Sequence, residues 1–283
     1  MRYLKLRRLL LFLVVLFFGA CSTEIQLARK IQKEKDKISI LCEFPDYIIR
    51  TNSFVPLPEG LDEEEQQTFL DSTFEYSRYV QYIDDEIFLQ NFIKHIKKEF
   101  KNHEINYYNK EQINEFLSSE GSLYLINFKQ LEIEERWEAF HDEMSTGSAS
   151  TPESNSKVII YEEDFWINGV SVNAWIDLAK VNDTVEIQRQ LYTESLLKDD
   201  VDGAFIENYS TGEMNYRSRI YPIQVEDLWE LELQSAEEFS SFIINVIINK
   251  EIRDRLNYIE GIEPVNEWEV SPKSGRILPE ELY

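Results

Sequence analysis

Carboxylates are the most abundant side chains in this chain that could perform chemistry. Six of them gather around a segment rich in Ser, Thr and Gly: Glu132, Glu134, Glu135, Glu162, Glu163 and Asp164. Glycoside hydrolysis needs two carboxylates about 5–10 Å apart, one of them in an apolar setting that raises its pKa. Because these acids alternate with apolar residues, most of them are expected on the solvated faces of strands. A hydrolytic pair is therefore the less favoured interpretation.

The spacing of potential metal ligands predicts no metal site. The chain has three histidines: His95, His103 and His141. No two of them are four residues apart with a glutamate between, as a zincin helix requires. The run Asp200–Gly203 is similar to part of a calcium loop, but in the EF-hand register Lys198 takes the first ligand position and Tyr209 the twelfth. We expect neither a metal nor another cofactor, and the sequence contains no nucleophile elbow, phosphate-binding loop or dinucleotide fingerprint.

Aromatic residues are the remaining candidates for a binding site. Flat rings stack on the apolar faces of sugars and peptides. Strand alternation places Trp175 on the face opposite Ile176 and Leu178, so we expect its ring to be exposed. Packing of such rings beneath a helix is nevertheless the favoured interpretation. The candidate ligand-binding residues are Tyr76, Trp166 and Trp175.

The two cysteines have different expected roles. Cys42 shares a strand face with Ile38, Ile40 and Phe44, which indicates a small buried apolar residue rather than a nucleophile. Cys21 directly follows the amino-terminal leader, and once its sulfur is modified only Cys42 remains, so no intramolecular disulfide is expected.

The first twenty-one residues have the three parts of a secretory signal. A basic start, Met1–Arg8, precedes ten apolar residues, Leu9–Phe18, and then the small residues Gly19 and Ala20. Ten residues rise only about 15 Å as a helix, half of a hydrocarbon core about 30 Å thick. This segment is therefore expected to be a leader and not a permanent membrane span.

The residues Phe18-Gly19-Ala20-Cys21 resemble the lipobox of bacterial lipoproteins. The resemblance implies that the leader is cut before Cys21, that Cys21 is lipidated on its sulfur, and that the new amino terminus is acylated. Ser22 is not the Asp associated with inner-membrane retention in that family, so an outer-membrane destination is implied. The residues after Cys21 also lack the acidic run expected for surface export in Bacteroidota, which favours a periplasm-facing protein.

The charge of the chain restricts its partners. Removing residues 1–20 removes four cations and no acid, which changes the formal net charge from −24 to −28. Such a chain repels nucleic-acid backbones and anionic headgroups. We therefore expect no nucleic-acid partner, and contact with the bilayer only through acyl chains on Cys21.

Apolar spacing predicts alternating strands and helices in the first half of the chain. Strands are expected at residues 38–44, 73–83 and 105–108, and a buried strand at 123–126 that becomes half-exposed from Leu131. A helix capped by Asp84 or Asp85 should bury Leu89, Phe92, Ile93, Ile96 and Phe100. A shorter helix capped by Asn109 should turn Ile113, Phe116 and Leu117 inward.

The second half is expected to hold a meander and a long helix. Residues 144–156 read as a loop, and Asn168-Gly169 and Asn182-Asp183 read as turns between three antiparallel strands. A polar loop at residues 199–203 should lead to a long helix that begins near Ser235, where Ser235 and Glu238 form a capping box.

The expected architecture is α/β (α+β). A strand–helix–strand–helix–strand lobe contributes to a mixed sheet, followed by the antiparallel meander and the C-terminal helix. The lobe, at residues 37–180, is similar to lobes of envelope lipoproteins that assist transport or assembly, and of uncharacterised Bacteroidota lipoproteins. The expected organisation is a signal peptide at 1–20, a lipidated tether at 21–37, one α/β domain at 38–262, and a loosely packed proline-containing tail at 263–283.

Three functions are compatible with these features. The favoured hypothesis is a non-enzymatic, membrane-anchored lipoprotein that acts as an accessory or scaffold in an envelope protein complex. The alternative is a lipoprotein that binds a glycan or peptide through the side of the sheet that carries Trp175 and Tyr76. A cell-wall glycan hydrolase is the third.

Overall fold

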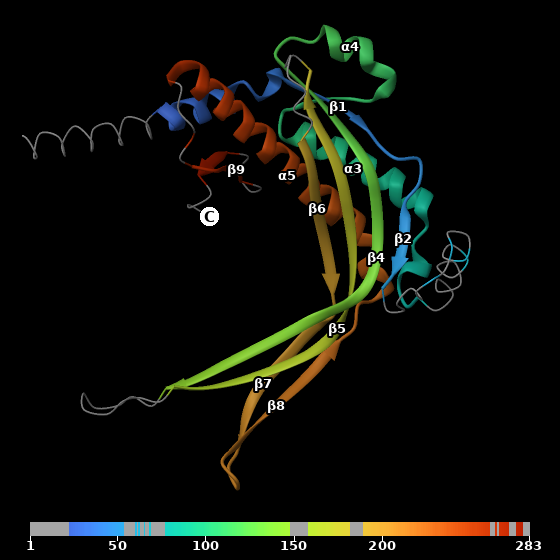
Figure 1. Cartoon of the computed structure of the whole chain (residues 1–283), viewed down its shortest axis with the longest axis vertical. Helices are drawn as coiled ribbons and strands as arrows, with labels where there is room; N and C mark the ends of the chain where they lie inside the picture. The colour runs from blue at the N-terminus through green and yellow to red at the C-terminus, as the bar shows by residue number, and fades with distance from the viewer. Residues whose placement is uncertain are drawn as a thin grey trace, which may run out of the picture.

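The computed structural model describes residues 23–53, 77–147, 158–181, 189–260, 266–271 and 276–279, with single residues at Gly60, Asp62, Glu65, Thr68 and Pro264. A curved β-sheet with helices against one face forms the body, and two long hairpins project from it (Figure 1). The expected α/β class, with a mixed sheet and a long C-terminal helix, is confirmed. Within the residues just given, none of the helices combines the length and hydropathy needed to span a bilayer.

The main sheet contains parallel and antiparallel strands. Its strands are β1 (Ile38–Glu43), β2 (Ile49–Asn52), β3 (Asn106–Tyr108), β4 (Ser122–Gly147), β5 (Val158–Lys180) and β6 (Arg189–Lys198). The order is β3-β1-β4-β5-β6, and β2 pairs with β4 further along than β1 does. β1 is parallel to β3 and β4, whereas β4, β5 and β6 are antiparallel neighbours. An antiparallel meander is therefore present, but it consists of β4, β5 and β6, and the two strands predicted on either side of Asn168-Gly169 are the single strand β5.

A register shift in β4 explains its change of hydrophobic pattern. Tyr124, Ile126 and Phe128 are buried at even positions, and after an irregularity between Phe128 and Gln130 the buried apolar residues are Leu131 and Ile133. An extra residue in one strand exchanges the two faces. The single strand predicted from residue 123 through the half-exposed part after Leu131 is thus present as β4.

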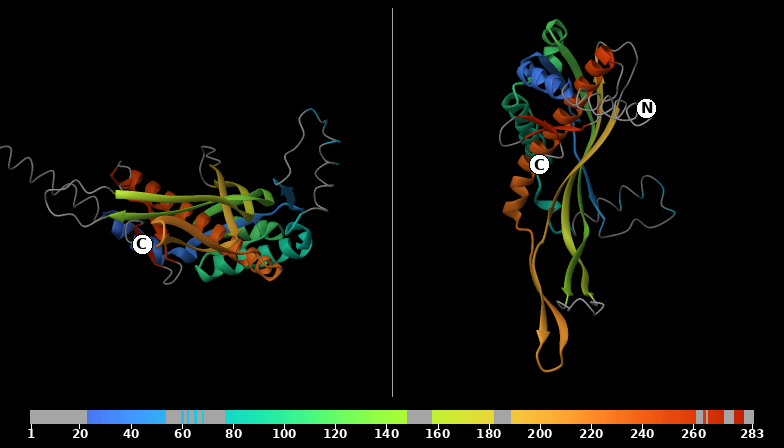
Figure 2. Two further views of the ribbon diagram at one scale, coloured as in Figure 1. Left: turned by 90° about the horizontal axis from the view of Figure 1, so that it is seen from below. Right: turned by 90° about the vertical axis from the view of Figure 1, so that its left-hand side faces the viewer.

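Helix α3 (Asp85–Asn102) forms as its local signals predict. The Asp84 carboxylate accepts a hydrogen bond from the backbone N–H of Ile87 at 3.0 Å and so caps the first turn. Phe92, Ile96 and Phe100 are buried as predicted. Phe88 is also buried, whereas Leu89 and Ile93 are only partly buried. This face packs on the sheet and on the C-terminal helix (Figure 2).

The C-terminal helix α5 (Val225–Glu260) begins before the predicted start. Ser235 lies inside the helix, fully buried, and its hydroxyl donates to the backbone carbonyl of Leu231 at 2.5 Å. The capping-box interpretation of Ser235 and Glu238 is therefore wrong. Leu228 and Leu231 extend the buried stripe toward the amino end, so packing lengthens the helix past the local signal.

The residues that follow Cys21 pack on the body. Residues 23–33 are helical, and Leu27, Ala28 and Ile31 are buried in the main core. The buried carboxylate of Glu24 accepts a hydrogen bond from the side-chain amide of Asn266 at 2.7 Å. This packing differs from the expected tether, because the few apolar residues in this polar segment share one helical face.

The carboxyl-terminal segment is also more firmly packed than expected. Strands β9 (Trp268–Val270) and β10 (Ile277–Pro279) form an antiparallel pair, and β9 packs on α5. Trp268 is buried, and its backbone N–H donates to the Asn249 side chain at 2.9 Å.

The short helix α4 (Ile113–Ser118) covers the opposite face of the sheet at one end. It follows a 3-10 turn, η3 (Lys110–Gln112), and packs Phe116 against Leu41 and Leu123. Ile113 and Leu117 are exposed, so their predicted inward orientation is wrong. A helix this short buries only one residue of the predicted three.

The predicted turn at Asn168-Gly169 is wrong, because β5 runs straight through it. Gly169 pairs with Arg136 of β4 and with Lys198 of β6, and it lacks the positive φ angle that the predicted turn requires. Glycine is needed here for close approach, since a Cβ atom would lie 2.6 Å from Cγ of Glu138. Strand pairing on both sides thus overrides the local turn preference.

Several other predicted segments differ or lie outside the described residues. Residues 77–83 contain a 3-10 turn, η2 (Val80–Tyr82), and not a strand, while residues 71–76 lie outside the described part. The predicted loop at 144–156 begins later, because β4 continues to Gly147, and its remainder lies outside the described residues. The Asn182-Asp183 turn lies outside them as well. The polar segment at 199–203 opens a hairpin formed by β7 (Asp200–Asn208) and β8 (Glu213–Tyr221).

Candidate functional site

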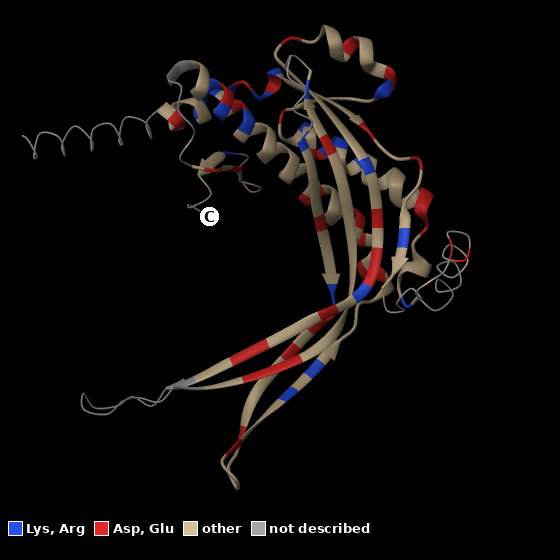
Figure 3. Ribbon diagram, viewed as in Figure 1, with Lys and Arg blue, Asp and Glu red and all other residues tan. Residues whose placement is uncertain are grey.

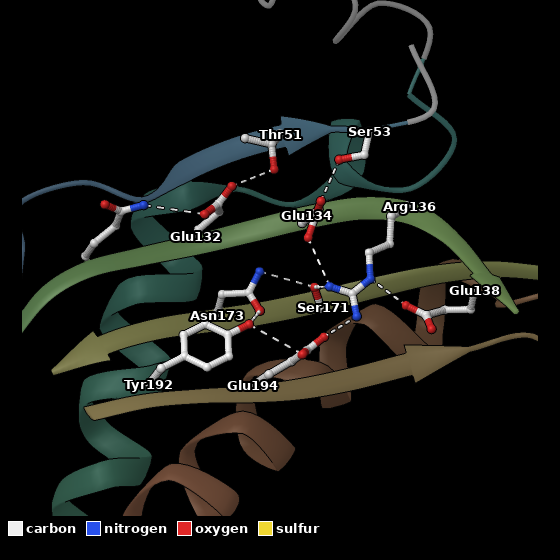
Figure 4. A network of polar contacts seen from close by, with 11 residues as sticks. Thr51, Ser53, Glu132, Glu134, Arg136, Glu138, Ser171, Asn173, Tyr192 and Glu194 are labelled. Carbon is white, nitrogen blue, oxygen red and sulfur yellow. Dashed lines mark hydrogen bonds and ion pairs between the residues drawn. The ribbon is translucent and has the colours of Figure 1, made fainter. Parts of the chain in front are cut away.

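The sheet face opposite α3 and α5 carries a network of ion pairs centred on Arg136. The guanidinium donates to Glu134 at 3.0 Å, and to Glu138 and Glu194 (Figure 4). Partial burial lowers the pKa of Arg136, but the hydrogen bonds that its guanidinium donates to Glu138 and Glu134 outweigh burial and keep the pKa above its usual value. Three carboxylates around one guanidinium leave this face acidic.

Strand alternation and register place these side chains together. Glu134 and Arg136 are two residues apart on β4, so both point to the same face. Glu194 on β6 pairs with Asn173 on β5, whose neighbour Ser171 lies opposite Glu134. On the β2 side, Glu132 accepts a hydrogen bond from the Thr51 hydroxyl at 2.7 Å. The network therefore links β2, β4, β5 and β6.

An aromatic pair lies on the same face beside this network. Trp175 and Tyr192 are directly opposite each other on β5 and β6, with ring centroids 5.2 Å apart and planes inclined by 57°. Trp175 is 37% exposed, which confirms its predicted exposure. The Tyr192 hydroxyl donates to the Asn173 side chain at 3.0 Å, and burial together with the nearby Glu194 raises the pKa of Tyr192. The pair presents two fixed rings next to polar groups.

The structure does not bring the predicted ligand-binding residues together. Trp166 lies nine residues from Trp175 along β5, about 30 Å at a rise of about 3.3 Å per residue. Tyr76 lies outside the described residues, as does Cys21, so the lipidation site stays a prediction.

The six acids singled out in the sequence also occupy different places. Glu132 and Glu134 belong to the open-face network, and Glu135 is fully buried on the other side of β4. Glu162 and Asp164 lie on an exposed face of β5 far from the network, and Glu163 lies half-buried on the other face of that strand. The carboxylates that do converge, from Glu134, Glu138 and Glu194, are held by Arg136, which removes the motivation for assigning them to glycoside hydrolysis.

The buried Glu135 carboxylate fixes the point where the long hairpins leave the body. It accepts backbone hydrogen bonds from Arg78 at 2.9 Å, Tyr79 at 3.0 Å and Val80 at 3.2 Å. A buried charge is tolerated when hydrogen-bond donors of this kind replace its water. Glu135 thus attaches residues 78–80 to β4.

A second buried carboxylate, Asp199, holds the strands at the same junction. One oxygen accepts hydrogen bonds from the backbone N–H of Asn168, at 3.0 Å, and from its side-chain amide, and the other accepts from the backbone N–H of Ile223 at 2.9 Å. The Arg78 guanidinium donates to the Asn168 side chain at 3.1 Å. The two carboxylates therefore connect β4, β5, the start of β7 and the entry to α5.

Beyond this junction the chain forms an arm with two layers. We define the arm as residues 136–147 and 158–168, which form one hairpin, together with the β7–β8 hairpin (Figure 1). Aromatic rings fill the space between the layers, with centroid distances from 4.8 to 6.2 Å. The rings belong to Phe140, Tyr161, Phe165, Phe205 and Tyr216.

A hydrogen bond and a glycine fit the two layers of the arm to each other. The Tyr216 hydroxyl donates to the Asp142 carboxylate at 2.9 Å. Burial and this hydrogen bond raise the pKa of Tyr216 to about 12. Gly203 makes room for that hydroxyl, because a Cβ atom at Gly203 would lie 1.8 Å from it.

Histidine and cysteine form no metal centre among the described residues. Burial lowers the pKa of the half-buried His95 and His103, and the exposed His141 has Nδ1 2.8 Å from a carboxylate oxygen of Asp164, which raises its pKa. Cys42 is buried, as predicted, and burial raises the pKa of its thiol. No group of three or more His, Cys, Asp or Glu side chains in the described segments is placed to hold a metal ion.

Sequence reasoning missed Arg136, Tyr192 and Glu194, which complete the open face, and the structural role of Glu135. A signal existed for Glu135, since it continues the buried alternation of Leu131 and Ile133. The other three could be placed only with the register of β4, β5 and β6.

No protein-family model matches the chain, and a search of curated proteins finds no significant match.

Proposed function

We propose that this protein is a non-enzymatic lipoprotein of the bacterial outer membrane that faces the periplasm and acts as an accessory or scaffold in an envelope transport or assembly complex. The anchor is Cys21, supported by the residues Phe18-Gly19-Ala20-Cys21. The observation that carries the scaffold role is the two-layer arm, which projects from the body and exposes Trp137 and Trp166.

The dimensions of the arm suit contact with another protein. The strand from Arg136 to Gly147 extends about 37 Å at about 3.4 Å per residue. The aromatic layer and the buried carboxylates Glu135 and Asp199 support a fixed geometry at the base of the arm. Large exposed aromatic side chains are enriched in protein interfaces. A rigid projection with exposed tryptophans is thus better suited to docking than to enclosing a substrate.

The position of the amino-terminal helix supports an arrangement in which the body lies near the membrane and the arm points away from it. Residues 23–33 pack on the core, so one residue, Ser22, separates Cys21 from the folded body, a span of at most about 7 Å. This helix lies at the opposite end of the molecule from the tip of the arm (Figure 2). An acyl chain on Cys21 would hold the body close to the bilayer while the arm reaches away from it.

Two measurements on the native protein test this function. Incorporation of a labelled fatty acid and partition into the detergent phase should occur with the wild type and be lost in Cys21→Ser. Chemical crosslinking of intact membranes should recover a partner with the wild type and lose it with Trp166→Ser. An unlabelled wild type that stays in the aqueous phase contradicts the anchor, and an unchanged set of partners in Trp166→Ser contradicts the role of the arm.

The aromatic pair on the open face favours a second candidate, a lipoprotein that binds a glycan or peptide. Trp175 and Tyr192 are both exposed and fixed against each other, beside Asn173 and Glu194. A contact between two aromatic rings is worth about 0.5–1.5 kcal/mol beyond the area that it buries, so either ring could bind an aromatic side chain of a peptide. Binding on a glycan array that is lost in both Trp175→Ala and Tyr192→Ala, and kept in Trp166→Ala, would favour this candidate over the scaffold.

A further inference from the structure

We propose that one exposed layer of the arm docks a partner protein whose surface is both basic and apolar. This layer, which we call the acidic arm face, consists of Trp137, Ala139, His141, Glu143, Ser145, Ile160, Glu162, Asp164 and Trp166. The inference rests on the proposed scaffold role and names the chemistry of the partner; it does not depend on the lipid anchor.

Strand alternation separates this face from the inner layer. Each of its residues is exposed, whereas the alternating neighbours Tyr161 and Phe165 pack on the rings of Phe205 and Tyr216 in the β7–β8 hairpin. The β7–β8 hairpin therefore covers one side of the β4–β5 hairpin and leaves the acidic arm face uncovered (Figure 1).

The charge of this face is unbalanced. Glu143 and Glu162 are directly opposite each other on β4 and β5, and like charges in that position destabilise a strand pair. Asp164 adds a third carboxylate, and His141 is the one side chain of the face that can carry a positive charge. The arm's acids appear along both strands in Figure 3. A cationic partner would relieve the repulsion that the free protein bears.

The exposed apolar side chains indicate that a small cation is not the ligand of this face, because a cation would leave them in contact with water. Trp137 and Trp166 are diagonal neighbours across the strand pair, about 7–8 Å apart. Trp166 is 65% and Trp137 45% exposed, and Ile160 is exposed toward the tip. From Trp137 to Ser145 the face is about 27 Å long at about 3.4 Å per residue. Its length and alternating acidic and aromatic groups match an extended protein surface.

The negative charge of the acidic arm face also indicates which class of macromolecule could bind it. Nucleic acids and anionic lipid surfaces would be repelled by the three carboxylates and by the whole chain. A protein segment that alternates Lys or Arg with apolar residues would place cations on Glu143, Glu162 and Asp164 and apolar side chains on the tryptophans. Electrostatic attraction of this kind raises the association rate and weakens with salt.

The test uses the full mature protein and a defined probe. The probe is a synthetic decapeptide of alternating lysine and leucine, and its counterpart alternates glutamate and leucine. Binding is followed by the fluorescence of the indole rings and by calorimetry at low and high salt. We expect binding of the lysine peptide with a shift in emission, weaker binding at high salt, and no binding of the glutamate peptide.

Matched variants test whether binding of the lysine peptide depends on the acidic arm face or only on the negative charge of the whole protein. The triple variant Glu143→Lys, Glu162→Lys and Asp164→Lys should weaken binding of the lysine peptide by about tenfold or more. The control triple Glu213→Lys, Glu230→Lys and Glu237→Lys changes net charge equally at exposed positions elsewhere and should change affinity by less than about threefold. Equal losses in both triples, or no loss in the first, would overturn the proposal.

A second matched pair tests the apolar contribution. Trp166→Ser should weaken binding several-fold, by about 1 kcal/mol or more for an interface tryptophan. Trp229→Ser, on α5 and 66% exposed, should leave binding unchanged. If the wild type self-associates in sedimentation and the acidic triple abolishes this, a second copy occupies the face and the proposed separate partner is wrong. If the native wild type carries no acyl chain but still binds the lysine peptide, the anchor is contradicted and this inference is unaffected.

Discussion

Glu135 is the residue whose substitution should most affect the base of the arm. In Glu135→Ala, the three backbone N–H groups of residues 78–80 lose their acceptor within the protein interior, and unsatisfied buried groups are costly. We expect the free energy of unfolding to fall by about 3 kcal/mol or more.

Denaturant unfolding measures this change, with Glu134→Ala as the control. Glu134 is a half-exposed member of the open-face network, so its loss should cost about 1 kcal/mol or less. Equal effects of the two substitutions would contradict the assigned role of Glu135.

Glu251 should make the stability of the protein depend on pH in acid. Its buried carboxylate accepts hydrogen bonds from Lys180 at 2.8 Å and from the Tyr124 hydroxyl at 2.6 Å. Burial raises the pKa of Glu251, but the Lys180 and Tyr124 hydrogen bonds outweigh burial, so the pKa lies below its ordinary value of 4.5. A carboxyl whose pKa is lower in the folded state stabilises the fold above its unfolded pKa, and this contribution is lost as the pH falls through the folded pKa.

The variant Glu251→Gln should therefore be less stable than the wild type at pH 7, by about 2 kcal/mol, and the difference should shrink as the pH falls below 4.5. Urea unfolding at several pH values measures this difference. Glu237→Gln, exposed on the same helix, should show no such trend. A difference that stays constant between pH 7 and strong acid would contradict the ion-pair account.

At the scale of elements, the two layers of the arm depend on Gly203. In Gly203→Ala, the new Cβ atom would overlap the Tyr216 hydroxyl, so the ring must move and lose its hydrogen bond to Asp142. We expect a local loss of about 1–2 kcal/mol, seen as faster hydrogen exchange in β7 and β8 with α3 unchanged. Ser218→Ala, at the cross-strand partner of Gly203, is the control and should leave exchange unchanged. Unaltered exchange in Gly203→Ala would show that the layers do not need this contact.

Elements with strong local signals could be predicted from the sequence. Helix α3 combines the Asp84 cap with apolar residues at helical spacing, and both signals act within a few residues. The hairpin of β7 and β8 was missed because its exposed face is polar and reads as a loop.

Predictions failed where distant contacts decide the local conformation. Asn168-Gly169 has the composition of a tight turn, but pairing with β4 and β6 and the hydrogen bonds to Asp199 keep it extended. In the candidate site, too, features set by one strand could be predicted and features set by several strands could not. The exposure of Trp175 follows from alternation within one strand, whereas the approach of Glu194 to Arg136 depends on the register of three strands.

Across the whole molecule, the helix next to the proposed anchor and the proposed docking arm lie at opposite ends (Figure 2). The helix at residues 23–33 ties the segment next to Cys21 to the core, and Glu24 ties it to the carboxyl-terminal segment through Asn266. The arm leaves the other end of the body with its tryptophans exposed. We therefore propose that the arm, and not the body, contacts other proteins in the envelope.

Site-specific photocrosslinking in native membranes tests that claim most directly. A photoreactive phenylalanine analogue replaces Trp166 on the arm in one protein and Trp229 on α5 in another, two positions of nearly equal exposure. The account predicts a discrete crosslinked protein from position 166 that is missing from position 229. Crosslinks of the same pattern from both positions, or a discrete product from position 229 alone, would contradict it.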